Sequence, residues 1–178
     1  MNWSAFPTAV YQQAPPYTWW NTYIRDNGNE TAVAKATTAG YHFVSTGTNA
    51  IAERAILGAS VDATETTTST SYVDLATPGP SVTMTTGTKA LIWMNVQLGN
   101  STSSQAFASY GVSGATTLAP ADSLGILSDN QATGAGGNRI GVCDLRALTA
   151  GSNTFFMQYR TQAGTGSFLR RRIQVMGL

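Results

Sequence analysis

The sequence predicts an all-β protein: an antiparallel β-sandwich, jelly-roll-like, with an extended N-terminal arm that carries aromatic residues, prolines and a short helix. Apolar and polar residues alternate in several segments, as they do in half-buried strands. About eight such segments lie between residues 65 and 178, roughly 8–12 residues apart with turn residues between them. Charged residues make up only 11% of the chain, and the Thr-rich polar surface that replaces them suits exposed sheet.

Composition and charge exclude several classes of function. The formal net charge of +1 gives no electrostatic case for nucleic acid or an anionic membrane as partner. No apolar run approaches the roughly 18–20 residues that span a bilayer. The start MNWSAFPTAV lacks the pattern of a signal peptide. The one cysteine, Cys143, has no internal disulfide partner, and we expect it to be a small buried side chain.

Residues 1–30 are predicted to form a docking arm. Gln12–Pro16 should be extended because of its prolines, and a short helix should begin with Thr18 as N-cap and end at Gly28. So small a segment cannot bury its own aromatic side chains, which therefore pack on the main domain or dock into another protein. The candidate docking interface consists of Trp3, Phe6, Tyr11, Tyr17, Trp19, Trp20 and Tyr23.

Residues 31–64 read as a connector between the arm and the sandwich. Tyr41–Val44 has the composition of a strand, followed by a turn over residues 46–49. Residues 50–57 (AIAERAIL) fit a helical turn and a strand equally well.

The sandwich domain is predicted to span residues 65–178, organised around the most apolar run of the chain, residues 90–98. Its residues Ile92, Met94, Val96 and Leu98 share one face, so this strand belongs in the middle of a sandwich. Two strands precede it, a short one over residues 72–75 and an alternating one over 81–85, separated by the proline-rich turn at 77–80. The later strands are expected at residues 106–112, 124–127, 139–145, 154–161 and 168–175, with an exposed glycine-rich loop at 129–138.

We find no catalytic or metal-binding constellation in the sequence, and we expect no enzyme activity and no cofactor. His42 is the single histidine, and no nucleophile elbow accompanies it. Too few His and Cys residues exist for a zinc site. The nine carboxylates are scattered, and Asp122 and Asp129, on either side of a short strand, are the one pair considered for calcium.

Two sets of residues are candidate contacts. In the final strand Leu169, Ile173 and Val175 should face the core. Arg170 and Arg172 then face outward, while Arg171 faces the core and needs a carboxylate partner or a position at a subunit boundary. The run Arg170–Arg172 is therefore a candidate subunit contact. Trp93 and Tyr110 are candidate glycan contacts, with core or subunit contacts as the alternative.

Several stretches resemble a known family. WNTYIRDN (20–27), AKATTAG (34–40) and GTNAIAER (47–54) resemble the N-terminal part of virion structural proteins of tailed phages of actinobacteria. ETTTSTSYVDLAT (65–77), GPSVT (79–83) and TGTKAL (86–91) are similar to the start of their β-sandwich domain. The resemblance covers residues 20–90 and continues beyond them as an architecture. It implies no catalytic residues.

The resemblance implies a non-enzymatic protein on the virion surface, assembled in the host cytoplasm: a minor tail protein, a head or tail fibre, or a capsid decoration. Its partners would be other virion proteins, the major capsid protein or tail proteins. A closed oligomer, most simply a homotrimer, is expected at a symmetry axis of the particle. The alternative function is a module that binds a host cell-surface glycan.

Overall fold

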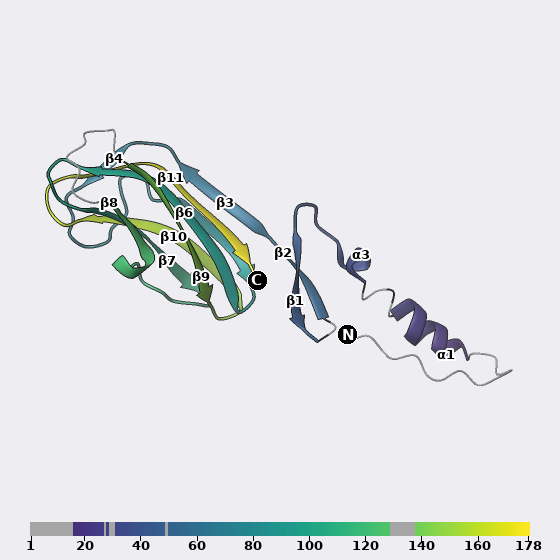
Figure 1. Cartoon of the computed structure of the whole chain (residues 1–178). Coiled ribbons are helices and arrows are strands. Elements are labelled where there is room, and N and C mark those ends of the chain that lie inside the picture. Colours follow the sequence, from purple (N-terminus) through teal and green to yellow (C-terminus); the bar gives the residue numbers. More distant parts are fainter. Residues whose placement is uncertain (1–15, 27, 29–30, 49, 129–137) are drawn as a thin grey trace. The chain divides into compact units, whose positions relative to one another are not determined.

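A computed structural model describes residues 16–26, 28, 31–48, 50–128 and 138–178. The chain divides into two compact units, Met1–Ala55 and Ile56–Leu178 (Figure 1). The expected glycine-rich loop at 129–138 lies outside the described residues, apart from Asn138.

The N-terminal unit contains a short helical segment and a β-hairpin. The helical segment comprises α1 (Tyr17–Trp19), the π-helical η1 (Trp20–Asp26) and, further on, α3 (Ala32–Lys35). Strands β1 (His42–Gly47) and β2 (Ala50–Arg54) pair antiparallel, so the strand predicted at 41–44 is confirmed. Helix α1 starts directly after an extended Pro16 at the N-cap position, which corrects the expected cap at Thr18.

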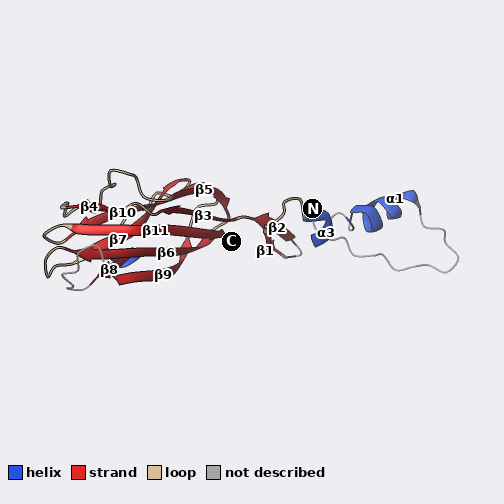
Figure 2. Ribbon diagram, turned by 90° about the horizontal axis from the view of Figure 1, so that it is seen from above, coloured by secondary structure: helices blue, strands red, loops and turns tan. Residues whose placement is uncertain are grey.

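The second unit is an antiparallel β-sandwich with jelly-roll topology, as predicted (Figure 2). One sheet has the order β3-β11-β6-β9, and the other β5-β10-β7-β8, so successive strands mostly alternate between the sheets. The strands are β3 (Ile56–Val61), β4 (Glu65–Thr67), β5 (Ser81–Thr86), β6 (Lys89–Asn100), β7 (Ala106–Gly114), β8 (Gly125–Ser128), β9 (Asn138–Ala147), β10 (Gly151–Thr161) and β11 (Gly166–Gly177).

The sandwich begins at Ile56, earlier than the boundary at residue 65 that the sequence predicts. Strand β3 pairs along β11, from Val61 opposite Arg171 to Ile56 opposite Met176. Residues 50–57, for which the sequence left a helical turn and a strand open, are extended. Residues 50–54 form β2 and residue 56 begins β3.

The core lies between the sheets and is built from the alternation that the sequence shows. Strand β6 lies between β11 and β9, and its inward residues Ile92, Met94, Val96 and Leu98 are at most 2% exposed. Burying each such side chain stabilises the fold by about 1.5–3 kcal/mol relative to leaving it exposed. Strands β5 and β10 contribute Val82, Met84, Phe155, Met157 and Tyr159.

The strand expected at residues 72–75 does not form. A single bridge joins Val73 to Tyr159. The segment that does form a strand before β5 is β4, which pairs with one end of β11. The hydroxyl of Ser69 donates to the Ser71 carbonyl and accepts from the Ser71 N–H. This local turn competes with a continuous ladder, and the prolines that follow have no N–H to donate.

A β-bulge in β11 changes which residues face the core. Leu169 lies opposite Gln97 and Arg172 opposite Asn95, so Arg170 and Arg171 together oppose the single residue Val96. Arg170 has a φ of 50°. The bulge turns Leu169 away from the buried face, which corrects its expected inward position, and places Phe168, Arg171 and Ile173 inside.

Candidate functional site

The two outer faces of the sandwich differ in how they are covered. On the sheet β5-β10-β7-β8, residues 106–112 of β7 are buried on both faces. Leu118 pairs with Val112 from the following loop. The guanidinium of Arg160 lies 3.7 Å from the ring centre of Phe107. The outer face of β7 is therefore covered by a loop and by Arg160.

The outer face of the other sheet carries a hollow of about 490 Å³. Strand register explains its composition: Trp93 lies between Gln174 and Cys143, and Asn95 lies between Arg172 and Gly141. The residues lining the hollow are Trp93, Met94, Asn95, Arg139, Gly141, Val142, Cys143, Arg172 and Gln174. They come from three adjacent strands that are far apart in the sequence.

The polar groups of the hollow are held by two defined contacts. Arg139 donates through Nε to Oδ1 of Asn95 at 2.6 Å. Arg172 lies 3.6 Å from Asp62 in an exposed ion pair, a type of pair that contributes little to stability. A Cβ placed on Gly141 would lie 3.2 Å from Nδ2 of Asn95, so the absence of a side chain there keeps the hollow open.

An apolar row crosses the same outer face at one end of the sheet. Register places Ile56 opposite Met176, Met176 opposite Leu91, and Leu91 opposite Leu145. Ile56 is 51% and Leu145 56% exposed. Neighbouring apolar side chains exposed in this way mark a surface that can form an interface.

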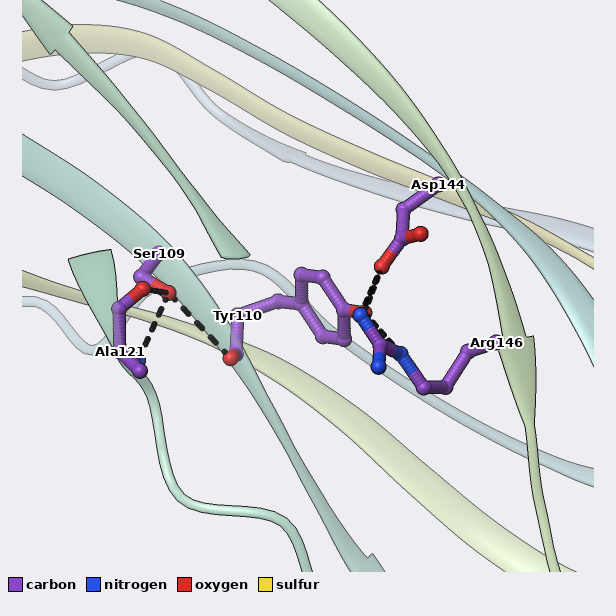
Figure 3. A network of polar contacts seen from close by, with 5 residues as sticks. All are labelled: Ser109, Tyr110, Ala121, Asp144 and Arg146. Atoms are coloured by element: carbon purple, nitrogen blue, oxygen red, sulfur yellow. Dashed lines mark hydrogen bonds and ion pairs between the residues drawn. The ribbon is translucent and has the colours of Figure 1, made fainter. Parts of the chain in front are cut away.

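Tyr110 crosses the interior of the sandwich and ends in a polar network (Figure 3). Its hydroxyl donates to Asp144 and accepts from Nε of Arg146 at 2.9 Å, while Arg146 and Asp144 form an ion pair. Burial, together with the bond to Asp144, raises the pKa of Tyr110 to about 12. Tyr110 has no exposed surface, so it is a core residue and the candidate glycan contact is corrected.

Arg171 is likewise enclosed within the sandwich, with 0% of its surface exposed. It lies 3.5 Å from Glu65, donates to the carbonyl of Thr77 at 3.1 Å, and approaches the ring of Tyr159. Hydrogen bonds from Thr77, with attraction to Arg171, lower the pKa of Glu65. The predicted carboxylate partner is thus found within the chain, and Arg171 is not the candidate subunit contact; Arg170 and Arg172 remain at the surface.

Asp122 is engaged by protein groups. It accepts from Arg160 Nε at 2.9 Å and from the Tyr72 hydroxyl at 2.8 Å, and these bonds lower its pKa. Asp129, the other residue considered for calcium, lies outside the described residues. Within the described ranges, no group of three or more His, Cys, Asp or Glu side chains is placed to hold a metal ion.

The remaining predicted residues are placed as follows. Tyr17 is 77% exposed and Trp20 55% exposed, whereas Trp19 is partly buried. Tyr23 lies in η1, and Trp3, Phe6 and Tyr11 lie outside the described residues. Cys143 is exposed rather than buried, because it lies opposite Trp93 on the outer face.

Sequence reasoning found Trp93 and missed its neighbours Arg139, Gly141 and Gln174. The alternation of residues 90–98 already groups Trp93 with Asn95 on one face. The partners from β9 and β11 depend on non-local register, for which the sequence carries no signal.

No family model and no curated protein matches the chain, but solved structures do. It is similar to VP2 in a subviral particle of infectious bursal disease virus, with a TM-score of 0.51 at 14% identity over 75% of this chain and 36% of the VP2 chain. It is also similar to Eiger TNF from S. frugiperda (TM-score 0.43, 13% identity, 69% of this chain and 92% of that chain). A third similar structure is the C-terminal CBM6 of LamC, a laminarinase from Zobellia galactanivorans (TM-score 0.32, 14% identity, 66% and 98%).

The match to VP2 agrees with the jelly-roll topology, and at this identity it establishes the fold alone. This chain corresponds to little more than a third of the VP2 chain. Among the described helices, none has the length and apolar character needed to cross a bilayer.

Proposed function

We propose that the protein is a non-enzymatic structural protein of a tailed-phage virion, displayed on the particle surface. Its N-terminal unit would anchor an oligomeric sandwich to the tail or capsid, as in a minor tail protein, a fibre or a decoration protein. The observation that carries the proposal is the division into a jelly roll and a separate N-terminal unit with exposed aromatic side chains. The jelly-roll fold shared with a viral capsid protein is compatible with this role.

The N-terminal unit has the properties of an anchor. Tyr17, Trp20 and Ile24 each expose more than half of their surface. Large aromatic side chains gain most from burial at an interface and often dominate its affinity. Their partner would be another virion protein, the major capsid protein or a tail protein.

Deleting residues 1–27 tests the anchor. We expect the remaining chain to be folded and soluble, and to be absent from purified particles of the phage that encodes it. Trp20→Ala should lower incorporation, whereas Asn21→Ala, an exposed neighbour in the same segment, should not. Normal incorporation of the deletion variant would overturn the anchoring role.

A second candidate function is binding of a host cell-surface glycan by the sandwich. The observation that favours it is the position of Trp93, partly exposed in the hollow and surrounded by amide and guanidinium side chains. Both functions are compatible in one protein. A glycan array in which Trp93→Ala loses all binding without loss of folding would support it, and an array without binding would contradict it.

A further inference from the structure

We propose that the hollow around Trp93 binds an acidic saccharide, that is, a sugar that carries a carboxylate, phosphate or sulfate group. The inference rests on the second candidate function and names the chemical class of its ligand. It is independent of whether the N-terminal unit anchors the protein to a particle.

The shape of the hollow suits a sugar ring. Its volume of about 490 Å³ lies within the range of roughly 300–1,000 Å³ typical of small-molecule sites. Trp93 offers a flat apolar surface against which the C–H groups of a ring can pack. Gly141, with no side chain, leaves space beside Asn95 for the rest of the ligand.

Hydrogen-bonding groups surround the aromatic ring. Asn95 accepts from Arg139 through Oδ1, and its Nδ2 is directed toward Gly141 and thus into the hollow. Gln174 lies directly opposite Trp93 on the neighbouring strand. The two amides are placed to bind the hydroxyl groups of a sugar that packs on Trp93.

The charge of the hollow selects an anion. It is lined by Arg139 and Arg172, and none of the described residues that line it carries a carboxylate. Arg139 uses Nε for Asn95, so its two terminal nitrogens can bind an acidic group in a bidentate manner. The exposed pair of Arg172 with Asp62 is long, at 3.6 Å, and can open for a ligand.

A single-stranded nucleic acid would also present rings and negative charges. Such ligands are held along grooves that supply many phosphate contacts as well as stacking surfaces, whereas this hollow supplies two arginines and one tryptophan. The net charge of +1 also gives no wider attraction. The observations therefore favour a saccharide.

The test uses the full chain on an array of carboxylated, phosphorylated and sulfated saccharides beside their neutral counterparts, with a dT12 oligonucleotide as a further probe. We expect acidic saccharides to bind at least about 10-fold more tightly than neutral ones, and added salt to weaken this binding. Trp93→Ala should abolish binding, and Arg139→Gln should remove the preference for acidic ligands. Arg170→Gln is the matched control, since it removes the same charge from a residue outside the hollow.

The outcomes distinguish failure of the acidic class from failure of glycan binding itself. Equal binding of acidic and neutral saccharides, unchanged by Arg139→Gln, would overturn the acidic class and leave glycan binding in place. A blank array would overturn both. Tighter binding of the oligonucleotide than of any saccharide would overturn the proposal in favour of nucleic acid. Thermal unfolding of each variant confirms that lost binding does not reflect lost folding.

Discussion

The side chain of Arg171 is fully buried. Its protein neighbours replace only part of the hydrogen bonding and charge stabilisation that water would supply. Glu65 provides the opposite charge, Thr77 a carbonyl, and Tyr159 the face of a ring. A buried charge of this kind is tolerated because its partner is present, and the pair need not stabilise the fold relative to apolar residues. Glu65 therefore offsets the free-energy cost of burying the positive charge of Arg171.

Glu65→Gln tests this role because glutamine keeps one oxygen that can accept from the Thr77 N–H and removes the negative charge. We expect the free energy of unfolding to fall by about 3 kcal/mol, the typical effect of leaving a buried charge without its partner. Adding Arg171→Met should restore most of the loss. Urea denaturation of the wild type, both single variants and the double variant gives the coupling energy. Additive effects of the two substitutions would contradict the pairing.

The same carboxylate makes stability depend on pH in the acid range. The pKa of Glu65 is below its ordinary value of 4.5 in the folded protein. A lowered pKa adds stability that is complete above about pH 4.5 and is lost as the pH falls through the folded-state pKa. Stability measured from pH 6 to pH 3 should therefore fall more steeply for the wild type than for Glu65→Gln. Parallel stability curves for the two proteins would show that Glu65 has the same pKa in the folded and unfolded states.

For Tyr110 we predict the opposite pH dependence, with stability lost at high pH. Its pKa of about 12 in the fold is above its ordinary value of 10.0, so its contribution is complete below pH 10 and is lost as the pH rises toward 12. Tyr110→Phe should lower the free energy of unfolding at neutral pH by about 1–2 kcal/mol, because Asp144 and Arg146 lose a buried hydrogen-bond partner.

The difference between wild type and Tyr110→Phe should shrink between pH 10 and pH 12. Comparing the two curves isolates Tyr110 from Tyr72 and Tyr159, whose pKa values burial also raises. A difference that stays constant with pH would contradict the assignment.

At the scale of the element, strands whose faces differ in burial were predictable from the sequence. Strands β5, β6 and β10 alternate between buried and less buried residues, and their sequences show the same alternation. Residues 106–112 of β7 are buried on both faces because a loop and Arg160 cover the outer one. Local alternation has no information on such covering, so it could not predict that outward residues of β7, such as Phe107, are buried.

The bulge in β11 shows a second limit of sequence reasoning. Residues Leu169, Arg171, Ile173 and Val175 follow a period of two, and only three of them are buried. The bulge depends on the pairing of β11 with β6, which is non-local. The hollow was out of reach for the same reason: Trp93 was recognisable, but Arg139 and Arg172 join it only through register.

Arg170 occupies a backbone conformation that favours glycine. Its φ of 50° costs a residue with a Cβ roughly 1–2 kcal/mol. Arg170→Gly should therefore raise the free energy of unfolding by up to about 1 kcal/mol, despite the loss of its exposed hydrogen bond to Gln97.

Arg172→Gly is the matched control, two residues further along the same strand. Glycine in an ordinary strand position should lower stability by about 1 kcal/mol. Denaturant unfolding of both variants decides the question. If Arg170→Gly destabilises the protein as much as Arg172→Gly does, the bulge does not store this strain.

At the scale of the whole molecule, the sandwich contains its own core. Among the residues that the structure describes, every core side chain below 2% exposure comes from residues 90–175, and both sheets of the sandwich are formed by strands from residue 56 onward. We expect a fragment of residues 56–178 to unfold in one cooperative transition at a midpoint close to that of the full chain. Calorimetry of both proteins measures this. A fragment that is unfolded at 25 °C would show that the sandwich depends on residues 1–55.

The apolar row Ile56–Met176–Leu91–Leu145 is where we expect copies of the sandwich to associate. Ile56 and Leu145 each leave more than half of their surface in water, and covering adjacent apolar side chains is favourable in proportion to the area removed from water. A closed homotrimer would bury one such row per subunit and would have three times the 18.7 kDa mass of a single chain.

Light scattering on the full chain should report the mass of this trimer. Leu145→Lys should shift it toward the monomer, because the ammonium group would have to lose its water in the interface. Leu127→Lys is the control: Leu127 is also exposed (42%) but belongs to β8 of the other sheet, so the mass should not change. A trimer that persists in Leu145→Lys would place the interface elsewhere, and a monomeric wild type would remove the oligomer from the proposal.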